Sequence, residues 1–248
     1  MKRRVSEIRA YYSMNIVTKH LNSFLDFFLP RQCEICGRRL AVCEKAVCTS
    51  CYMILPRTYQ WKQPYDNRMV RLFWGRIRVE RGAAFLFYQP HSPASHLFYQ
   101  LKYHDRPDIG VQLGRLAAIE LDKDNFFEGI DLIVPLPLSW KRERKRGYNQ
   151  CYEIARGVAQ VKKIPIVRNA MKRIKETPTQ THKNSAERFE NVSQAFKCVR
   201  PELLNGKHVL MIDDVVTTGA SLLSCAEEMQ KQSDVLISVF TLGHTYTL

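Results

Sequence analysis

The sequence has no apolar run long enough to span a membrane and no long low-complexity tract, and we expect no secretory leader. Its first apolar stretch is broken by Lys19 and His20, and no small-residue cleavage site follows. With 45% hydrophobic residues, the chain of 248 residues has enough apolar side chains for a substantial core. These features predict a folded, soluble, cytoplasmic protein of one large or two small domains.

Acidic residues are also few in this chain. It has 24 Asp and Glu residues against 38 Lys and Arg residues, which gives a net charge of +14. Such an excess of positive charge attracts phosphorylated small molecules, nucleic acids or acidic lipid headgroups, and composition alone does not choose among them.

The cysteines are concentrated near one end of the chain. Residues 33–51 contain two C-x2-C pairs, separated by 11 residues, and one further cysteine, Cys43. In a reducing compartment, clustered cysteines bind metal more often than they form disulfides. Two such pairs can place four thiolates tetrahedrally around Zn²⁺ with no open position, which predicts a structural site. The predicted ligands are Cys33, Cys36, Cys48 and Cys51, and Cys43 is expected to lie outside the site.

Helical and strand patterns separate along the chain. An apolar stripe at 14–29 predicts an amphipathic helix that ends at Pro30. A strand is expected at 81–90 and two helices within 92–121. Further strands are expected at 130–138, 164–174, 208–215 and 235–243, with helices at 147–163 and 219–232. This alternation predicts an α/β fold with a parallel sheet, in which ligands bind at the carboxyl ends of the strands.

The stretch VLMIDDVVTTGAS, residues 209–221, combines a buried strand with polar residues at its end. Asp213 and Asp214 follow four apolar residues, and a loop of small and hydroxylated residues comes next. Gly219 permits a tight turn, and the helix after it directs free N–H groups at the loop, which favours a phosphate. Adjacent carboxylates can accept hydrogen bonds from neighbouring ribose hydroxyls. A ribose 5-phosphate unit therefore satisfies both halves of the stretch.

The same stretch resembles the phosphoribosyl pyrophosphate (PRPP) signature of type I phosphoribosyltransferases. It differs from a Walker loop because it lacks the Gly-Lys-Thr/Ser step. The resemblance implies a type I phosphoribosyltransferase fold that binds PRPP with Mg²⁺, and it gives the two acids the catalytic role. The implied PRPP-binding residues are Asp213, Asp214, Val216, Thr217, Thr218, Gly219, Ala220 and Ser221.

Two further segments fit this resemblance. VPLPLSWKRERKRGYNQ (134–150) corresponds to the loop that grips pyrophosphate, although some of its basic residues could simply begin a solvated helix. The implied pyrophosphate-binding residues are Pro135, Leu136, Lys141, Arg142 and Arg146. TPTQTHKNSAERFENVSQAF (177–196) corresponds to a flexible loop that closes over the substrate, or else is an ordinary surface loop. Its implied residues are Gln180, Arg188 and Asn191.

The order of CxxC…CxxC, LKY, VPLPL…RGYNQ, TPTQ…ERFENV…AF and DDVVTTGAS resembles the ComF family, proteins associated with natural competence and DNA uptake. The match runs from about residue 20 to the C-terminus; residues 1–13 and Cys43 have no clear counterpart. The resemblance implies a phosphoribosyltransferase-like enzyme that transfers ribose 5-phosphate to an unknown acceptor. Two other functions stay open: a single-stranded-DNA-binding accessory protein of the competence machinery, and a PRPP sensor without catalysis.

The expected organisation has three parts. These are an N-terminal extension with the amphipathic helix (1–31), a four-cysteine zinc-binding module (32–57) and a phosphoribosyltransferase domain (58–248). Within the last part, 58–128 would form the hood and first helices, and 129–248 the PRPP-binding core. Basic residues surround the zinc module and make it the expected platform for single-stranded DNA: Arg38, Arg39, Lys45 and Arg57.

Overall fold

The computed structural model describes residues 31–175 and 194–245 of the chain. Contacts within the protein divide the chain into two compact units, Met1–Ile54 and Leu55–Leu248. The predicted helix at 14–29 and the predicted substrate-covering residues Gln180, Arg188 and Asn191 lie outside the described residues.

In the first unit, the chain folds back on itself around the cysteines. An antiparallel bridge joins Gln32 to Arg39, and the turn between them contains Gly37 with a φ of 71°, a conformation that favours glycine. The short helix α2 (Thr49–Met53) follows, and the Sγ atom of Cys48 caps it by accepting a hydrogen bond from the amide of Cys51. Each C-x2-C pair therefore lies in a hydrogen-bonded turn.

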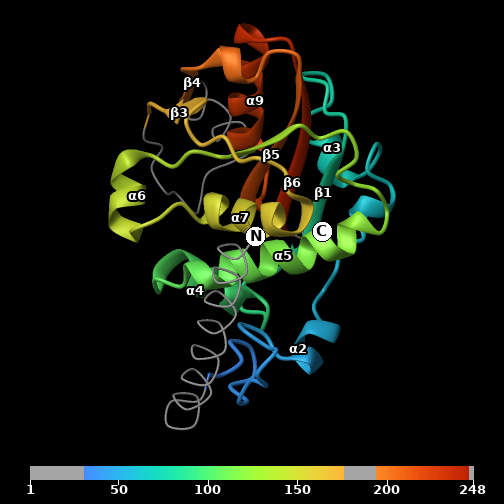
Figure 1. The fold of residues 1–248 in the computed structure, drawn as a ribbon, viewed down its shortest axis with the longest axis vertical. Helices are drawn as coiled ribbons and strands as arrows, with labels where there is room; N and C mark the ends of the chain where they lie inside the picture. Colours follow the sequence, from blue (N-terminus) through green and yellow to red (C-terminus); the bar gives the residue numbers. More distant parts are fainter. Residues whose placement is uncertain (1–30, 176–193, 246–248) are drawn as a thin grey trace, which may run out of the picture. The chain divides into compact units, whose positions relative to one another are not determined.

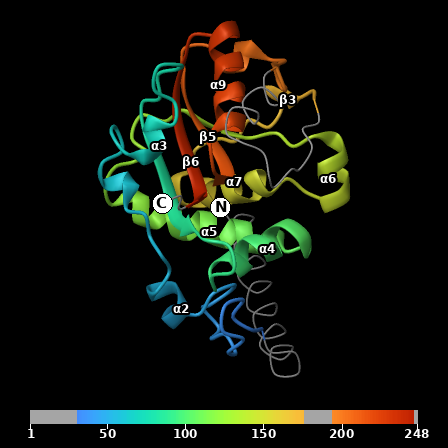
Figure 2. The same cartoon turned by 180° about the vertical axis from the view of Figure 1, so that it is seen from behind.

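The second unit is built on a four-stranded sheet (Figures 1 and 2). Its strands are β1 (Gly82–Tyr88), β2 (Leu132–Pro135), β5 (Lys207–Val216) and β6 (Val235–Thr245). They lie in the order β1-β6-β5-β2, and all neighbouring strands pair in parallel. The run Val209–Ile212 of β5 is fully buried, as expected for an interior strand that is covered on both faces.

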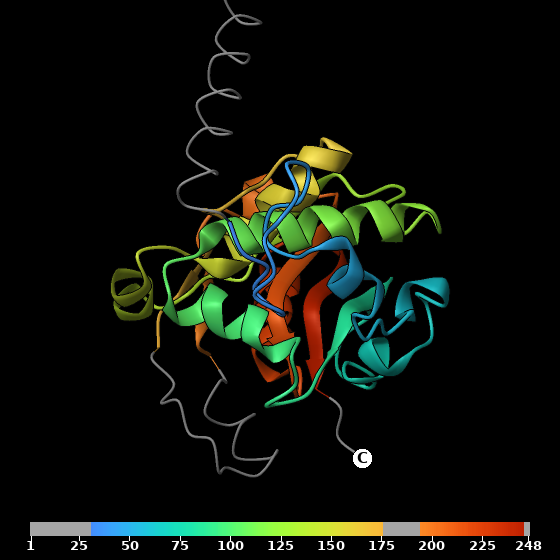
Figure 3. The ribbon, with the colours of Figure 1, turned by 90° about the horizontal axis from the view of Figure 1, so that it is seen from below.

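Helices flank this sheet. Helices α5 (Pro107–Asp122) and α7 (Gln150–Lys162) lie side by side across it in Figure 3, and α7 contacts β2 and β5. Helix α9 (Ala220–Gln232) shares a buried cluster with alternate strand residues, among them Val209, Met211 and Val239. The predicted α/β fold with a parallel sheet flanked by helices is confirmed.

The remaining helical elements are shorter. They are α3 (Arg68–Arg71), α4 (Ser95–Tyr103), α6 (Trp140–Arg146) and two 3-10 turns, Gln60–Lys62 and Pro201–Leu203. Within residues 31–175 and 194–245, none of the helices has both the length and the apolar character needed to cross a membrane.

Helices α5 and α7 approach each other closely because glycines stand at their contact. A methyl group added at Gly157 would overlap the carbonyl oxygen of Val111, and one added at Gly114 would overlap that of Ile154. Glycine removes the side chain that would hold the two backbones apart. This contact sets the spacing between the middle of α7 and the middle of α5.

The strand predicted at 164–174 is different in the structure. Ile166 makes a single parallel bridge to Ile133 at the edge of the sheet. The chain then forms β3 (Met171–Arg173), which pairs antiparallel with β4 (Phe196–Cys198) in a separate two-stranded sheet. Exposed Arg168 and Asn169 interrupt the apolar pattern at this point, so a continuous buried strand cannot form there.

We expect Gly157→Ala to destabilise the protein although alanine is the better helix former. Helix propensity favours alanine by about 1 kcal/mol, but overpacking against Val111 costs about 1–3 kcal/mol. Urea denaturation followed by circular dichroism measures the free energy of unfolding. Gly110→Ala is the comparison variant and should cost less stability, because an added methyl group there lies 3.0 Å from the flexible end of the Leu101 side chain. If Gly157→Ala were as stable as the wild-type protein or more stable, the close helix contact would be contradicted.

Candidate functional site

Strand β5 carries its two acids to the carboxyl edge of the sheet. Ile212 pairs with Pro135 of β2, and Asp213 pairs with Thr241 of β6. Asp214 is only 5% exposed, whereas Asp213 is partly exposed. The acids therefore lie where parallel sheets bind ligands, at the end of a strand that both neighbours hold in place.

Asp214 is held by side chains from two helices. Its Oδ2 atom accepts a hydrogen bond from Nε2 of Gln150 at 2.9 Å and forms an ion pair with Nζ of Lys102 at 3.1 Å. Burial opposes the charge of Lys102, but the attraction of Asp214 and Asp213 outweighs it and raises the pKa of the lysine. Lys102 therefore remains protonated beside the acids.

Asp213 has different partners. Its Oδ1 atom accepts a hydrogen bond from Sγ of Cys151 at 3.3 Å and from the backbone amide of Asp214 at 2.8 Å. Burial and then repulsion from Asp214 raise the pKa of Asp213 to about 6. Burial, together with the nearby acids, also raises the pKa of the Cys151 thiol, so this group stays protonated and donates.

The loop after β5 leads directly into α9. Gly219 has a φ of 74° and packs against Leu72, where an added Cβ atom would lie 3.3 Å from the leucine Cβ. Helix α9 has no side-chain cap, so the N–H groups of its first turn point into the loop and attract an anion. The predicted loop residues are differently exposed: Thr217 is exposed, Thr218 and Ser221 are partly exposed, and Val216, Gly219 and Ala220 are buried.

The segment after β2 is fixed at both ends beside the acids. The amide of Leu136 donates to the carbonyl oxygen of Ile212 at 2.8 Å, and the carbonyl oxygen of Leu136 accepts from Nδ2 of Asn149 at 3.0 Å. The Asn149 side chain also caps α7. The predicted residues Pro135 and Leu136 thus lie next to β5, and the amide of Leu136 is used within the protein rather than directed at a ligand.

Helix α6 brings basic residues to the same region. The guanidinium carbon of Arg146 lies 5.6 Å from the centre of the Tyr103 ring. Its Nη1 atom is buried and has no hydrogen-bond partner among the described residues, an arrangement that an anionic ligand would stabilise. Lys141 and Arg142 lie in the first turn of α6. Burial and then the charge of Arg142 lower the pKa of Arg173 in β3.

The structure therefore gathers acids, cations and an uncapped helix N-terminus at one edge of the sheet. This set can bind a ligand that carries hydroxyl groups together with anionic groups. Lys102 and Gln150, which hold Asp214, were not among the predicted site residues. Both stand in motifs that the sequence shows, LKY and RGYNQ, but Gln150 meets an acid 64 positions further along the chain, and spacing alone does not reveal such a contact.

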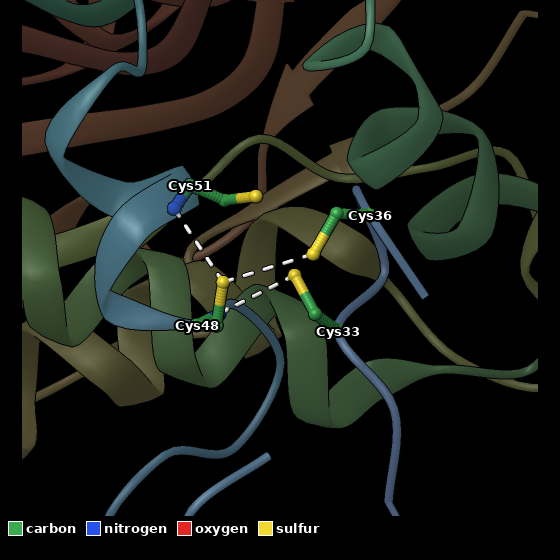
Figure 4. A group of neighbouring side chains, drawn as sticks. All are labelled: Cys33, Cys36, Cys48 and Cys51. Atoms are coloured by element: carbon green, nitrogen blue, oxygen red, sulfur yellow. Dashed lines mark hydrogen bonds between the residues drawn. The ribbon is translucent and has the colours of Figure 1, made fainter. Parts of the chain in front are cut away.

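Four thiols converge in the first unit, as Figure 4 shows. The sulfur atoms of Cys33, Cys36, Cys48 and Cys51 lie within 4.8 Å of one another, and those of Cys36 and Cys48 are 3.8 Å apart. Tetrahedral zinc with Zn–S bonds of about 2.3 Å needs sulfur atoms about 3.8 Å apart. The cluster is compatible with structural zinc in its size and its ligand chemistry, and Cys43 is not one of its members.

Neighbouring groups act differently on two thiols of this cluster: burial raises the pKa of Cys51, whereas hydrogen bonds lower that of Cys48. Arg38 donates a hydrogen bond from Nη2 to Sγ of Cys48 at 3.3 Å, which lowers the pKa of Cys48 to about 6. The backbone amide of Cys48 donates to Sγ of Cys33 at 3.3 Å. Hydrogen bonds from the amides of Ala41 and Thr49 hold Glu44 in the loop between the pairs and lower its pKa to about 2.

One of the four basic residues predicted to surround the zinc module, Arg57, does not contribute to its surface. Arg57 lies in the second unit, where its Nη2 atom pairs with Oε1 of Glu120 at 2.9 Å. Its side chain is 6% exposed, so it cannot serve a surface that binds DNA. The prediction for Arg57 is wrong because a buried ion pair uses its charge.

Comparison with known proteins finds relatives over most of the chain, although no protein-family model matches it. The chain is 27% identical to DNA utilization protein YhgH of Escherichia coli (strain K12) over 86% of this chain and 90% of that protein. It is 30% identical to the YhgH protein of Salmonella typhi over 62% of this chain and 68% of that protein. For competence protein F of Haemophilus influenzae, the identity is 29% over 61% and 68% of the two chains.

Solved structures show weaker likenesses. The chain is 18% identical to glutamine PRPP amidotransferase from B. subtilis, with a TM-score of 0.39, over 58% of this chain and 30% of that one. It is 19% identical to an adenine phosphoribosyltransferase, with a TM-score of 0.36, over 57% and 73% of the two chains. At these TM-scores, neither likeness supports a statement about function.

We expect purified protein to contain one tightly bound zinc ion per chain. Cys36→Ser should lower the zinc content and the solubility, because three thiolates cannot close a tetrahedral site. Elemental analysis by mass spectrometry gives the zinc content. Cys43→Ser is the matched control and should retain the metal, since Cys43 lies outside the cluster; full zinc content in Cys36→Ser would refute the assignment.

Proposed function

Because this chain belongs to the ComF family of competence proteins, we propose that it binds PRPP with Mg²⁺ and transfers ribose 5-phosphate to an acceptor. The observation that carries the proposal is the acid pair near the carboxyl end of β5, a parallel strand from which the loop at 217–219 leads into the uncapped N-terminus of α9. We also propose a role in DNA uptake, in keeping with the name of the relative called competence protein F.

The parts of PRPP would bind to different parts of the site. Asp213 and Asp214 would accept hydrogen bonds from the ribose hydroxyls. The loop from Thr217 to Ser221 and the first turn of α9 would hold the 5-phosphate, where N–H groups and the helix dipole favour negative charge. The segment after β2, including Arg146, would face the pyrophosphate, and Mg²⁺ would neutralise part of its charge.

In the transfer, a nucleophile on the acceptor forms a bond to C1 of the ribose while the bond from C1 to the pyrophosphate oxygen breaks. Pyrophosphate leaves with the electron pair, and the acceptor loses a proton. The transition state resembles an oxocarbenium ion, so negative charge near the ribose and positive charge near the pyrophosphate both stabilise it. The residues described above would act by positioning and by charge. Without an acceptor, the same site would serve as a PRPP sensor.

The remaining parts have supporting roles in this proposal. Gln180, Arg188 and Asn191 lie outside the described residues, and the family resemblance would give them contacts with the bound substrate. The four-cysteine cluster would hold zinc for structural purposes, because four thiolates leave no position open for chemistry. A cysteine cluster that binds metal suits the reducing conditions of the cytoplasm, which we propose as the location.

Binding of single-stranded DNA is a second candidate function, favoured by exposed aromatic residues close to basic ones. Tyr103 is 61% exposed beneath Arg146, and Trp140 is 68% exposed with the guanidinium of Arg144 5.1 Å from its ring. Bases of a single strand stack on such rings, while arginines attract the phosphates. Three residues of this patch, Trp140, Arg144 and Arg146, lie on α6, which the transferase proposal also uses.

We expect isothermal calorimetry to show PRPP–Mg²⁺ binding that is lost when Asp213 and Asp214 are replaced together by Asn. The loss should reach at least about tenfold, because charge-assisted hydrogen bonds to the ribose disappear. Asp234→Asn is the control, since this exposed acid precedes β6 at the opposite end of the sheet. Unchanged affinity in the double variant, with the fold retained, would show that the acids do not bind PRPP.

We expect labelled single-stranded DNA to bind at low salt, with an affinity that falls steeply as salt rises, because neutralised phosphates release counterions. Fluorescence anisotropy across a salt series measures this. Trp140→Ala should weaken binding by about fivefold or more, since stacking on one base is lost. Tyr65→Ala is the control, because Tyr65 is 68% exposed and follows Pro64, whose carbonyl oxygen accepts from the amide of Gly82 at the start of β1, the opposite end of the sheet. No binding at low salt would remove this candidate.

A further inference from the structure

Lys102 is the central residue of the LKY motif, but the sequence does not show what this lysine contacts. It lies on α4, yet its Nζ atom reaches Oδ2 of Asp214 at 3.1 Å with the side chain only 25% exposed. A lysine is rarely buried without a partner, and this one keeps its charge because two acids surround it. Its contact is with the acid pair itself rather than with the outer surface of the site.

A second cation lies close to Lys102. The charge of Arg146 is near enough to oppose the protonation of Lys102, while the Nη1 atom of Arg146 is buried without a hydrogen-bond partner among the described residues. Two like charges that repel each other, one of them with an unsatisfied donor, are stabilised when an anion binds between them. Tyr103, next to Lys102 in the chain, lies under Arg146 and keeps this arginine close to the end of α4.

We propose that Lys102 is a further binding and positioning residue of this site, with two roles. It fixes the carboxylate of Asp214 for the ribose, and together with Arg146 it forms a cationic subsite for the pyrophosphate group. This inference rests on the proposed binding of PRPP. The proposed pyrophosphate site so far contains only the segment after β2. The inference adds to it a positive charge from another element, α4.

The two roles of Lys102 affect the binding of different ligands. Positioning of Asp214 affects only a ligand that carries the ribose. The cationic role affects inorganic pyrophosphate as well, because this ligand contains the anionic groups without the sugar. Titration of both ligands therefore separates the two roles, and Asp214→Asn removes the first role while leaving the second.

The experiment compares Lys102→Met with Lys207→Met by calorimetric titration of PRPP and of inorganic pyrophosphate. Lys207 is an exposed lysine at the opposite end of β5, so its replacement removes the same charge from the protein but not from the site. We expect Lys102→Met to weaken both ligands by about tenfold or more, as for the loss of a charge-assisted hydrogen bond. Lys207→Met should change either affinity by less than about twofold.

Lys102→Met leaves Asp214 buried without its cation and could fail to fold. The variant with both Lys102→Met and Asp214→Asn avoids this, because neither charge is then left without a partner. Its affinity for pyrophosphate should still lie about tenfold below that of Asp214→Asn alone. Equal affinities of these two variants would overturn the cationic role.

The outcomes also separate this inference from the proposed function. Wild-type protein that binds neither PRPP nor pyrophosphate refutes the proposed function, and the inference with it. Wild-type protein that binds both ligands, with affinities that Lys102→Met leaves unchanged, refutes the role of Lys102 alone. Thermal unfolding of each variant confirms that the affinities are compared between folded proteins.

Discussion

Asp213 and Asp214 place two adjacent carboxylates near the end of a buried strand, where their negative charge must be neutralised or hydrogen-bonded. The side chains around this end of β5 meet that requirement. Repulsion between Asp213 and Asp214 would destabilise this edge of the sheet if both were charged and unpaired. The protein meets the requirement in two different ways. Lys102 and Gln150 bind Asp214, while Asp213 has a raised pKa and a protonated thiol beside it. The two acids are therefore neighbours in sequence but chemically distinct.

This difference was not visible in the sequence. The stretch from Val209 to Ser221 predicts the strand, the acids, the turn at Gly219 and the helix, because local patterns determine each of them. The partners of the acids come from α4 and α7, and which helix residue meets which acid depends on how these helices pack on the sheet. The strand expected at 164–174 shows the same limit: an apolar composition indicates extended chain, but exposed Arg168 and Asn169 decide that it leaves the sheet.

The four-cysteine cluster illustrates the opposite case. The four members of the cluster follow from spacing alone, because each C-x2-C pair is a local turn and only two turns have to come together. The contribution of Arg38 does not follow from spacing, since a hydrogen bond from its side chain to Cys48 depends on the detailed fold of the module. Arg57, which the sequence places near the module, instead pairs with Glu120 in the other unit, and only the three-dimensional contact reveals this.

The glycines between α5 and α7 have a consequence for the charged site. Gln150 begins α7, and an added methyl group at Gly110 of α5 would meet both Leu101, next to Lys102, and Glu153 of α7. The two partners of Asp214 therefore belong to helices, α4 and α7, that both pack on glycines of α5. A change in this packing would alter the distances from Asp214 to Lys102 and Gln150 together, without touching any charged residue. Apolar substitutions at this helix contact would then change how firmly the carboxylate of Asp214 is held.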